Sequence, residues 1–527
     1  MTSPAPRARV RPIKLIRVAC LLATAVACSS SDGPPSGSGS GGQAAGTGGA
    51  AGTTPGGATG GAAAIGGGAA GQGGGAGTTQ PVPLPLPPLV TSAEGAYWKT
   101  DGQLTEVASG VADVTIDDGA VAQRWDGFGG TFSERSGNYL SQLSASDKEM
   151  ALQLLFGPDG LRFNLGRIPI GASDYAIDRY TLNETPGDTP MSKFSIERDK
   201  QELIPYIKAA LAVAPGLHLW ASPWSPPTWM KSNGAFDGGT MKEDDATLQA
   251  FALYLTKFVQ EYGKQGIPIE VVHPQKEPNL ALDFPSCVWS AAAMTKFIGA
   301  YLGPMFADQK VNAKIFLGSL SEDGGSGKAR AIISAVTADA TALTYVKGFG
   351  FEWDGVRLVA EVKPMNLPIW QDNHNVGNLP WSGGTFRRDA APNDHAYAVT
   401  SWAFIRDWIR AGVNAYFTSS MILDSVGVGI GTMLWPQNAL LVVDASSKKL
   451  VVTPAYHLFR HLSPYVDPGA NVIGTSGGDA LAFKNADGTI VAVLHNPGDA
   501  KTTIVAMAGK KLKFEMPANG WATVKAK

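Results

Sequence analysis

The chain of 527 residues, 44% of them hydrophobic, is long enough to bury the core of one large domain and of a smaller companion. Lys and Arg number 43 and Asp and Glu number 45, which gives a formal net charge of -2. Because neither sign of charge dominates, composition does not favour a nucleic-acid partner or an anionic lipid surface, and a neutral ligand is expected.

The amino terminus is typical of an export signal. A basic stretch, 7–17, precedes the apolar run 18–27, which is too short to span a membrane. Cys28 then completes an Ala-Val-Ala-Cys sequence that resembles the cleavage box of bacterial lipoproteins, in which this cysteine becomes the acylated amino terminus. We expect residues 1–28 to export the protein to the bacterial cell envelope as a lipoprotein. The alternative is a plain secretory signal and a secreted protein.

Residues 29–90 consist mainly of Gly, Ala, Ser, Thr and Pro. Such a segment cannot bury enough apolar surface to offset the entropy lost on ordering, so a disordered tether is predicted. Its proline-rich end, 81–88, should be extended. Function is therefore expected to lie in the part of the chain beyond the tether.

Two β-rich regions flank a long alternating region. Residues 93–125 and 466–527 contain short β-forming runs with turn signals, among them 101–102 and 487–488, and are expected to share one β-sandwich. Between them, 126–465 alternates apolar strand-like runs with amphipathic helical patterns. The eight runs are 127–132, 162–167, 217–221, 269–272, 314–317, 348–353, 367–370 and 413–417.

This alternation predicts an α/β fold, a (β/α)8 TIM barrel with a companion β-sandwich built from amino-terminal and carboxy-terminal strands. An open, doubly wound sheet is the alternative, but no glycine-rich phosphate loop follows an early strand. In a TIM barrel the reactive side chains follow the carboxyl ends of the strands, so the residues after each run are the candidates for chemistry.

Glu277 follows the fourth run, on a turn of sequence His-Pro-Gln-Lys-Glu-Pro. A carboxylic acid there could protonate a glycosidic oxygen and then activate water, which makes Glu277 the candidate general acid/base. The neighbouring Lys276 argues against this role, because a cation favours the ionised carboxylate. The alternative interpretation is an ordinary glutamate of a surface loop.

Two other turns carry groups suited to binding a sugar. After the second run, Arg167 and then the sequence Ser173-Asp174-Tyr175 could supply hydrogen bonds to hydroxyl groups. After the third run, prolines on both sides of Trp224 disfavour a place inside a helix or strand, so its indole could stack on a sugar ring. Each of these residues alone is also compatible with an ion pair or with core packing.

Several ordered segments carry a family resemblance: 126–134 (DGFGGTFSE), the Ser-Pro-Trp and Glu-Pro turns, 371–381, 434–444 and 453–463. From about residue 93 to 527 the chain resembles glycoside hydrolase family 30, including its glucosylceramidase-like and endo-β-1,6-glucanase-like members. The resemblance implies a hydrolase of carbohydrate metabolism that acts on β-linked glucosides or glucans with retention of configuration. It also implies one reacting Glu after the fourth strand and a second after the seventh.

By position, the resemblance assigns the acid/base role to Glu277 and the nucleophile position to Asn373, whose amide is a poor nucleophile. The Asn that precedes the acid/base in the family is Lys276 here, and the Trp-Asn pair of the eighth strand is 419–420, two serines. The pocket implied by the resemblance therefore departs from the family pattern at three places.

A substitute nucleophile is therefore needed. Asp372 is adjacent to Asn373, but neighbouring residues of a strand face opposite sides, so Asp372 would need a bulge to point inward. Glu352, on the sixth run, is the better candidate, because the resemblance implies a Gln at this position and a carboxylate could have moved between neighbouring strands. Retaining chemistry requires two carboxyl groups about 5 Å apart and inverting chemistry about 6.5 to 9.5 Å, which tests either candidate against Glu277.

Two functions remain open at this point: an active β-glycosidase, or a carbohydrate-binding protein that has lost catalysis. The candidate substrate-binding residues are Asp174, Trp224, Lys276, Trp353, His374 and Trp381. A structural surface protein is a third, weaker alternative. No metal or cofactor is expected, because the seven His show no paired ligand spacing, and a monomer is expected.

Overall fold

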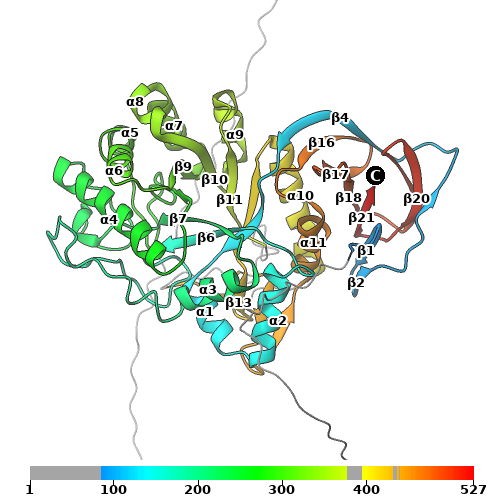
Figure 1. Cartoon of the computed structure of the whole chain (residues 1–527), viewed down its shortest axis with the longest axis horizontal. Coiled ribbons are helices and arrows are strands. Elements are labelled where there is room, and N and C mark those ends of the chain that lie inside the picture. Colours follow the sequence, from blue (N-terminus) through cyan, green and yellow to red (C-terminus); the bar gives the residue numbers. More distant parts are fainter. Residues whose placement is uncertain (1–84, 377–393, 431–435, 438) are drawn as a thin grey trace, which may run out of the picture. The chain divides into compact units, whose positions relative to one another are not determined.

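The computed structural model describes residues 85–376, 394–430, 436–437 and 439–527 (Figure 1). The export signal with Cys28, the tether up to residue 84, and Trp381 lie outside these ranges. Within the described ranges, no helix is both long enough and apolar enough to cross a membrane.

Eight parallel strands close into a barrel in the described part of the chain, and β12 pairs back onto β5. They are β5 (Gly127–Thr131), β6 (Leu165–Ile170), β7 (His218–Pro223), β8 (Val271–Val272), β9 (Lys314–Leu320), β10 (Val346–Glu352), β11 (Ile369–His374) and β12 (Ala415–Ser420). Each of the eight predicted runs overlaps one of these strands, so the TIM barrel is confirmed. Strand β5 packs closely on β6, since a Cβ on Gly129 would lie 2.2 Å from the carbonyl oxygen of Leu165.

Helices connect the strands, and polar side chains fix where several of them begin. Ser144, Asp244 and Thr453 each accept a backbone N–H at the start of α2, α4 and α11. The α-helices are α1 (Glu134–Ser141), α2 (Ala145–Phe156), α3 (Leu203–Val213), α4 (Asp245–Lys264), α5 (Ala291–Lys296), α6 (Gly303–Asp308), α7 (Lys328–Ala338), α8 (Ala340–Tyr345), α9 (Val359–Val362), α10 (His395–Ala411) and α11 (Pro454–Leu462). Short 3₁₀ or π segments are η1 (Thr228–Met230), η2 (Phe297–Leu302), η3 (Asp323–Gly325), η4 (Gly355–Leu358), η5 (Lys363–Met365) and η6 (Ser463–Tyr465).

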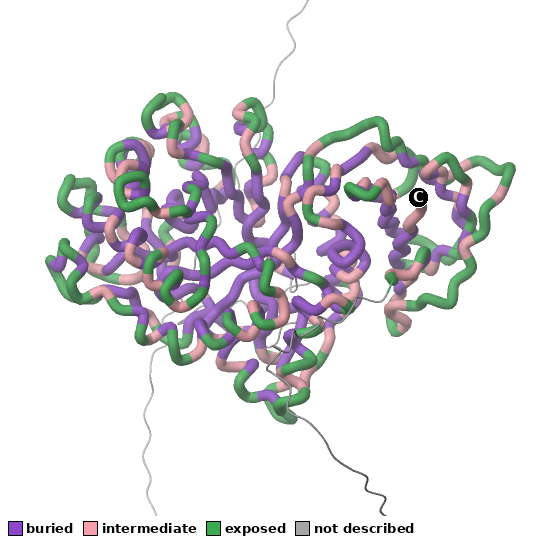
Figure 2. The backbone as a smooth tube through the Cα atoms, in the orientation of Figure 1, coloured by how far each residue is buried: buried purple, intermediate pink, exposed green. Residues whose placement is uncertain are grey.

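The barrel interior is filled in layers, and Figure 2 shows its strands as buried. The layer toward the amino ends of the strands is hydrophobic and consists of Leu165, Trp220, Val271, Phe316, Trp370, Ala415 and Phe417. Side chains two residues further along a strand point the same way, so the next inward layer contains polar groups. These are Arg167, Ser222, His273, Ser319 and Asp372, all fully buried. The polar layer forms the floor on which the barrel mouth rests.

The other β-rich part joins amino-terminal and carboxy-terminal strands in one sheet, in the order β2-β1-β21-β18-β17-β16-β4-β19-β20-β3, which confirms the predicted companion. Its strands are β1 (Leu89–Ala93), β2 (Ala96–Lys99), β3 (Thr105–Glu106), β4 (Val114–Arg124), β16 (Asn471–Ser476), β17 (Asp479–Lys484), β18 (Ile490–Asn496), β19 (Lys501–Met507), β20 (Lys510–Met516) and β21 (Gly520–Ala526). A further small sheet contains β13 (Ile422–Asp424), β14 (Leu441–Val443) and β15 (Leu450–Val452).

Two details of this sheet differ from expectation. The first strand begins at Leu89, before the expected boundary at 93. The hairpin predicted at 101–102 is wrong, because β2 pairs with β1 and β3 pairs with β20. The hairpin at 487–488 is confirmed by the antiparallel pairing of β17 with β18.

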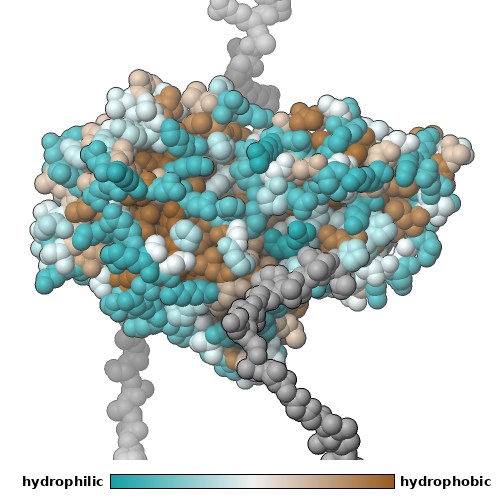
Figure 3. Space-filling model, in the orientation of Figure 1, coloured by the Kyte–Doolittle hydropathy of each residue, from teal (hydrophilic) through white to brown (hydrophobic). Residues whose placement is uncertain are grey.

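One hydrophobic core extends from the barrel to the companion sheet, where the rings of Trp125 and Phe483 lie 5.9 Å apart. His461 of α11 joins the same two parts, since its two ring nitrogens lie 2.8 Å from Ser92 Oγ and 2.8 Å from Thr523 Oγ1. Hydrophilic residues cover most of the face shown in Figure 3, with hydrophobic residues visible between them. Among the described residues, most of the large hydrophobic side chains are buried.

Candidate active site

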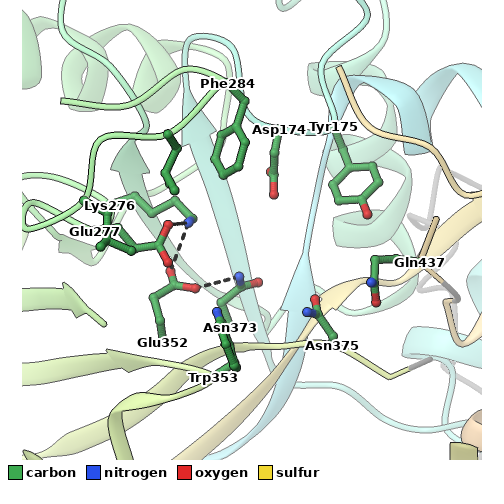
Figure 4. Close-up of a pocket in the computed structure, with 12 residues that line it drawn as sticks. Asp174, Tyr175, Lys276, Glu277, Phe284, Glu352, Trp353, Asn373, Asn375 and Gln437 are labelled. Atoms are coloured by element: carbon green, nitrogen blue, oxygen red, sulfur yellow. Dashed lines mark hydrogen bonds and ion pairs between the residues drawn. The ribbon is translucent and has the colours of Figure 1, made fainter. Parts of the chain in front are cut away.

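A pocket opens at the carboxyl ends of β6, β8, β10 and β11 (Figure 4). It encloses about 640 Å³ of space, part of it open to solvent. Its lining residues are Asp174, Tyr175, Lys276, Glu277, Leu280, Leu282, Phe284, Glu352, Trp353, Asn373, Asn375 and Gln437. This is the end of a TIM barrel at which catalytic groups are found, so the strand ends predicted from the sequence meet at one place.

Glu277 lies on a turn that its two neighbouring strands hold in place. Its backbone N–H donates to the carbonyl oxygen of Ser319 on β9 over 2.8 Å, and the N–H of Lys276 donates to Pro223 on β7 over 2.8 Å. Glu277 has a φ of 44°, a left-handed conformation that is costly for a residue with a side chain. The strand contacts stabilise this conformation and keep the buried carboxyl group at the pocket.

Glu352 is the last residue of β10 and is fully buried. Its Oε1 accepts a hydrogen bond from Arg167 Nη1 at 3.3 Å, and its Oε2 accepts one from Asn373 Nδ2 at 2.8 Å. Arg167 is itself fixed, because Nη2 donates to Ser222 Oγ at 2.9 Å. The carboxylate of Glu352 is therefore held on both oxygens.

Lys276 lies between the two glutamates. Its ammonium donates to Glu277 Oε2 and lies 3.9 Å from Glu352 Oε1. Dashed lines mark both contacts in Figure 4. Because the two carboxyl groups share one cation, the two oxygens that contact it lie at most about 6 Å apart, which is compatible with the spacing of a retaining pair. The expectation that Glu277 faces a replacement acid across one hollow is met by Glu352.

Burial dominates the electrostatics of this pair. It raises the pKa of Glu277 and raises the pKa of Glu352 to about 8, while Lys276 opposes both shifts. The two carboxyl groups therefore hold a proton between them at neutral pH. Lys276 stays charged, since burial lowers its pKa but the carboxylates of Glu277 and Glu352 raise it further.

The hydrogen-bond donors indicate where this proton resides. Both oxygens of Glu352 face N–H donors, so a proton on either oxygen would point at another proton. Glu277 has one oxygen on Lys276, and no hydrogen bond to its Oε1 is found among the described residues. The arrangement favours a protonated Glu277 beside an ionised Glu352.

Asp372 is buried in the barrel and does not line the pocket. In the pairing of β10 with β11, Phe351 lies opposite Gln371 and Glu352 lies opposite Asn373, so Asp372 is skipped and the bulge foreseen for it exists. Asp372 nevertheless continues the inward layer: its Oδ2 lies 3.2 Å from His273 Nδ1 and 2.2 Å from where a Cβ on Gly350 would be. Of the two candidate nucleophiles, only Glu352 faces Glu277.

The other predicted groove residues divide into two groups. Asp174 and Trp353 line the pocket, as does Lys276, and burial raises the pKa of Asp174. Trp224 does not: it is 1% exposed, and the guanidinium of Arg167 lies 4.4 Å from its ring centre, so the predicted sugar-stacking role is replaced by packing under a cation.

His374 is a packing residue rather than a sugar contact. Its ring is tilted against Phe404 of α10 at 4.5 Å and stacks on Tyr416 at 5.8 Å, and it does not line the pocket. Burial lowers the pKa of His374 to about 4, so it is neutral. Because the β11 bulge changes the alternation, His374 points toward the helix layer and Asn373 reaches the pocket.

Sequence reasoning missed several lining residues. They are Leu280, Leu282, Phe284, Asn375 and Gln437. Leu280, Leu282 and Phe284 follow the Glu-Pro turn within seven residues of Glu277, so proximity in sequence was the available signal. Gln437 lies in the segment between β13 and β14. In the sequence, only the family resemblance of residues 434–444 indicated this segment. In the described ranges, no group of three or more His, Cys, Asp or Glu could hold a metal ion.

Comparisons with known proteins agree with this architecture. Models of the TIM-barrel domain and of the beta sandwich domain of glycosyl hydrolase family 30 match residues 125–357 and 469–524. Lysosomal acid glucosylceramidase of Mus musculus is 25% identical over 414 residues, 73% of this chain and 75% of that protein. Endo-1,6-beta-D-glucanase neg1 of Aspergillus fumigatus is 23% identical over 440 residues, 78% and 87% of the two chains. Among solved structures, SrfJ from Salmonella typhimurium has a TM-score of 0.74 at 23% identity and covers 83% of this chain and 99% of its own.

Proposed function

Because this chain belongs to glycoside hydrolase family 30, we propose that its pocket hydrolyses β-linked glucosides or glucans with Glu277 and Glu352 as the reacting carboxyl groups. The single observation that carries this assignment is the shared ammonium of Lys276, which holds both carboxyl groups at one hollow. Glu352 thereby takes the part that Asn373, at the family's nucleophile position, cannot perform.

The reaction proceeds in two steps with retention of configuration. Glu277 donates its proton to the glycosidic oxygen while an oxygen of Glu352 bonds to the anomeric carbon, and the aglycone leaves. Water then attacks the same carbon, Glu277 takes a proton from that water, and the ester bond to Glu352 breaks. Glu277 returns to its protonated state, so protons balance over the cycle.

The remaining lining residues suit a neutral sugar. Asp174, Asn375 and Gln437 offer hydrogen-bonding groups for hydroxyls, while Phe284 and Trp353 offer apolar ring faces. The cations of the pocket already have partners within the protein, since Arg167 contacts the carboxyl group of Glu352 and Lys276 contacts that of Glu277. The names of the relatives, a glucosylceramidase and an endo-1,6-beta-D-glucanase, support a β-glucosidic substrate.

Hydrolysis of 4-nitrophenyl β-glucoside and of β-1,6-glucan by the full-length chain tests the proposal. We expect product release, with the β-anomer detected first by NMR, and a loss of release of at least about 1,000-fold in Glu277→Gln and in Glu352→Gln. Glu270→Gln is the matched control, because Glu270 lies at the opposite end of the barrel and pairs with His218. Sugar binding by calorimetry without any release would instead establish a carbohydrate-binding protein.

For localisation, we propose export with a lipid anchor at Cys28, which the leader sequence supports. Palmitate labelling in a bacterial host is expected to mark the wild-type chain and not Cys28→Ser. A protein found in the medium without label would indicate plain secretion. A monomer is also proposed, and light scattering of the purified chain tests it.

A further inference from the structure

Asn373 lies beside Glu352 at the carboxyl ends of two neighbouring barrel strands. The two residues are register partners in the parallel pairing of β10 with β11, and both line the pocket. The amide of Asn373 donates to Glu352 Oε2 at 2.8 Å (Figure 4). The chain therefore holds an amide and a carboxylate as one hydrogen-bonded pair where the reaction is proposed to occur.

We infer that the amide of Asn373 positions the carboxylate of Glu352 for attack, and that the two groups can be interchanged between the strands. A carboxylate at residue 373 would then attack when residue 352 carries the amide. This inference rests on the proposed function, because it requires Glu352 to be the nucleophile.

The positioning role follows from how the oxygens of Glu352 are held. Oε1 accepts from Arg167 Nη1 at 3.3 Å and faces Lys276, whereas Oε2 accepts from Asn373. Without the amide, Oε2 has no donor from the described part of the chain, and the carboxylate can rotate about its last side-chain bond, a torsion that has only weak preferences. Since a misplacement of about 1 Å can lower a rate about 100-fold, loss of the amide should slow attack by about that factor.

The exchange follows from the position of Arg167. Its Nη1 also lies 3.5 Å from the backbone carbonyl oxygen of Asp372 on β11, so the guanidinium faces the ends of both strands. Ser222 holds it there through Nη2. A carboxylate on residue 373 would remain next to this cation, and a Gln on residue 352 would supply the amide donor. The pocket has room for the one additional methylene group of a Glu at 373.

Covalent labelling with 2-deoxy-2-fluoro-β-glucosyl fluoride tests both parts. The attacking carboxylate forms an ester bond to the anomeric carbon, fluoride leaves, and the fluorine at C2 slows hydrolysis of the ester. Peptide mass spectrometry then locates the sugar. We expect the label on Glu352 in the wild-type chain, no label in Glu352→Gln, and a label on residue 373 in the double variant Glu352→Gln/Asn373→Glu.

The positioning role has its own measurement. Asn373→Leu, of similar size but without a donor, should still carry the label on Glu352 while kcat falls about 100-fold and KM changes much less. Asn373→Gln, which restores an amide, should recover at least tenfold of that loss. Thermal unfolding of each variant confirms that it is folded.

The outcomes separate the two proposals. A label on Glu352 together with unchanged kcat in Asn373→Leu would refute the positioning role and leave the proposed function intact. A folded double variant that takes up no label would refute the exchange. A wild-type chain labelled elsewhere, or not at all, would remove Glu352 as nucleophile and overturn the proposed function together with this inference.

Discussion

Replacement of Lys276 by Met should move the pH dependence of hydrolysis, because Lys276 is the cation that both reacting carboxyl groups share. The change removes the charge and keeps most of the volume of the side chain. Lys276 lowers the pKa of Glu277 and of Glu352 against the larger effect of burial. Without it, both groups retain a proton to higher pH.

The size of the shift can be worked out from the geometry. Two unit charges about 4 Å apart, as Lys276 Nζ and Glu352 Oε1 are at 3.9 Å, interact by about 4 kcal/mol at an effective dielectric constant near 20. This corresponds to about 3 pKa units, the upper end of the range of about 1 to 3 units seen for a close opposite charge. We therefore expect the alkaline limb of activity to rise by at least one pH unit.

The assay is kcat/KM for an aryl β-glucoside from pH 4 to 10, which reports groups of the free enzyme. The wild-type chain should lose activity as the pH rises past about 8, where the pair loses its proton. Lys276→Met should be less active than wild type near pH 6, where Glu352 is now neutral, but should stay active to higher pH. Lys208→Met on α3 is the control, since Lys208 donates to Gln265 on the outer surface. An alkaline limb that stays in place or moves down would refute this reasoning.

Three further predictions concern stability. Arg167→Met leaves the buried carboxylate of Glu352 without its closest cation and should cost about 3 to 5 kcal/mol in urea unfolding at pH 8; an equal stability to wild type would show that the pair contributes little. Burial raises the pKa of Asp199 from 3.8 to about 6. The protonated side chain therefore stabilises the fold below pH 4, and this stability is lost as the pH rises to 6. Between pH 4 and 7, Asp199→Asn should gain about 3 kcal/mol of stability relative to wild type. Burial lowers the pKa of His461 to about 3, so the stability that its neutral ring provides above pH 6.5 is lost as the pH falls below that value. His461→Gln should therefore lose less stability than wild type on acidification. For Asp199 and for His461, curves of unfolding free energy against pH that run parallel in variant and wild type would refute the prediction.

The strands of the barrel could be predicted because they are short apolar runs bounded by turn-forming residues close by in the sequence. The position of Glu277 could also be predicted, since it follows β8 directly and the turn carries it to the barrel mouth. The hairpin at 101–102 could not, because the partner of β3 is β20, about 400 residues further along the chain. Pairings of that kind depend on tertiary contacts that local turn signals do not contain.

The choice between Asp372 and Glu352 could not be made from the sequence. It depends on one irregularity in the pairing of β10 with β11, which turns Asp372 toward His273 and brings Asn373 to the pocket. Trp224 illustrates a second limit. Its flanking prolines indicate a loop, but they do not reveal that the indole packs in the core with the guanidinium of Arg167, from another strand, against its ring.

The presence of Lys276 and that of Glu352 are linked by charge. A buried carboxylate at 352 beside a neutral residue at 276 would be held only by Arg167 and Asn373, and a buried ammonium at 276 without a second carboxylate would face Glu277 alone. With both present, two cations face two carboxyl groups, so each buried cation contacts a carboxyl group and each carboxyl group contacts a cation. Lys276, which in the sequence argues against catalysis, therefore becomes in the structure the group that allows a second carboxylate to be buried beside Glu277.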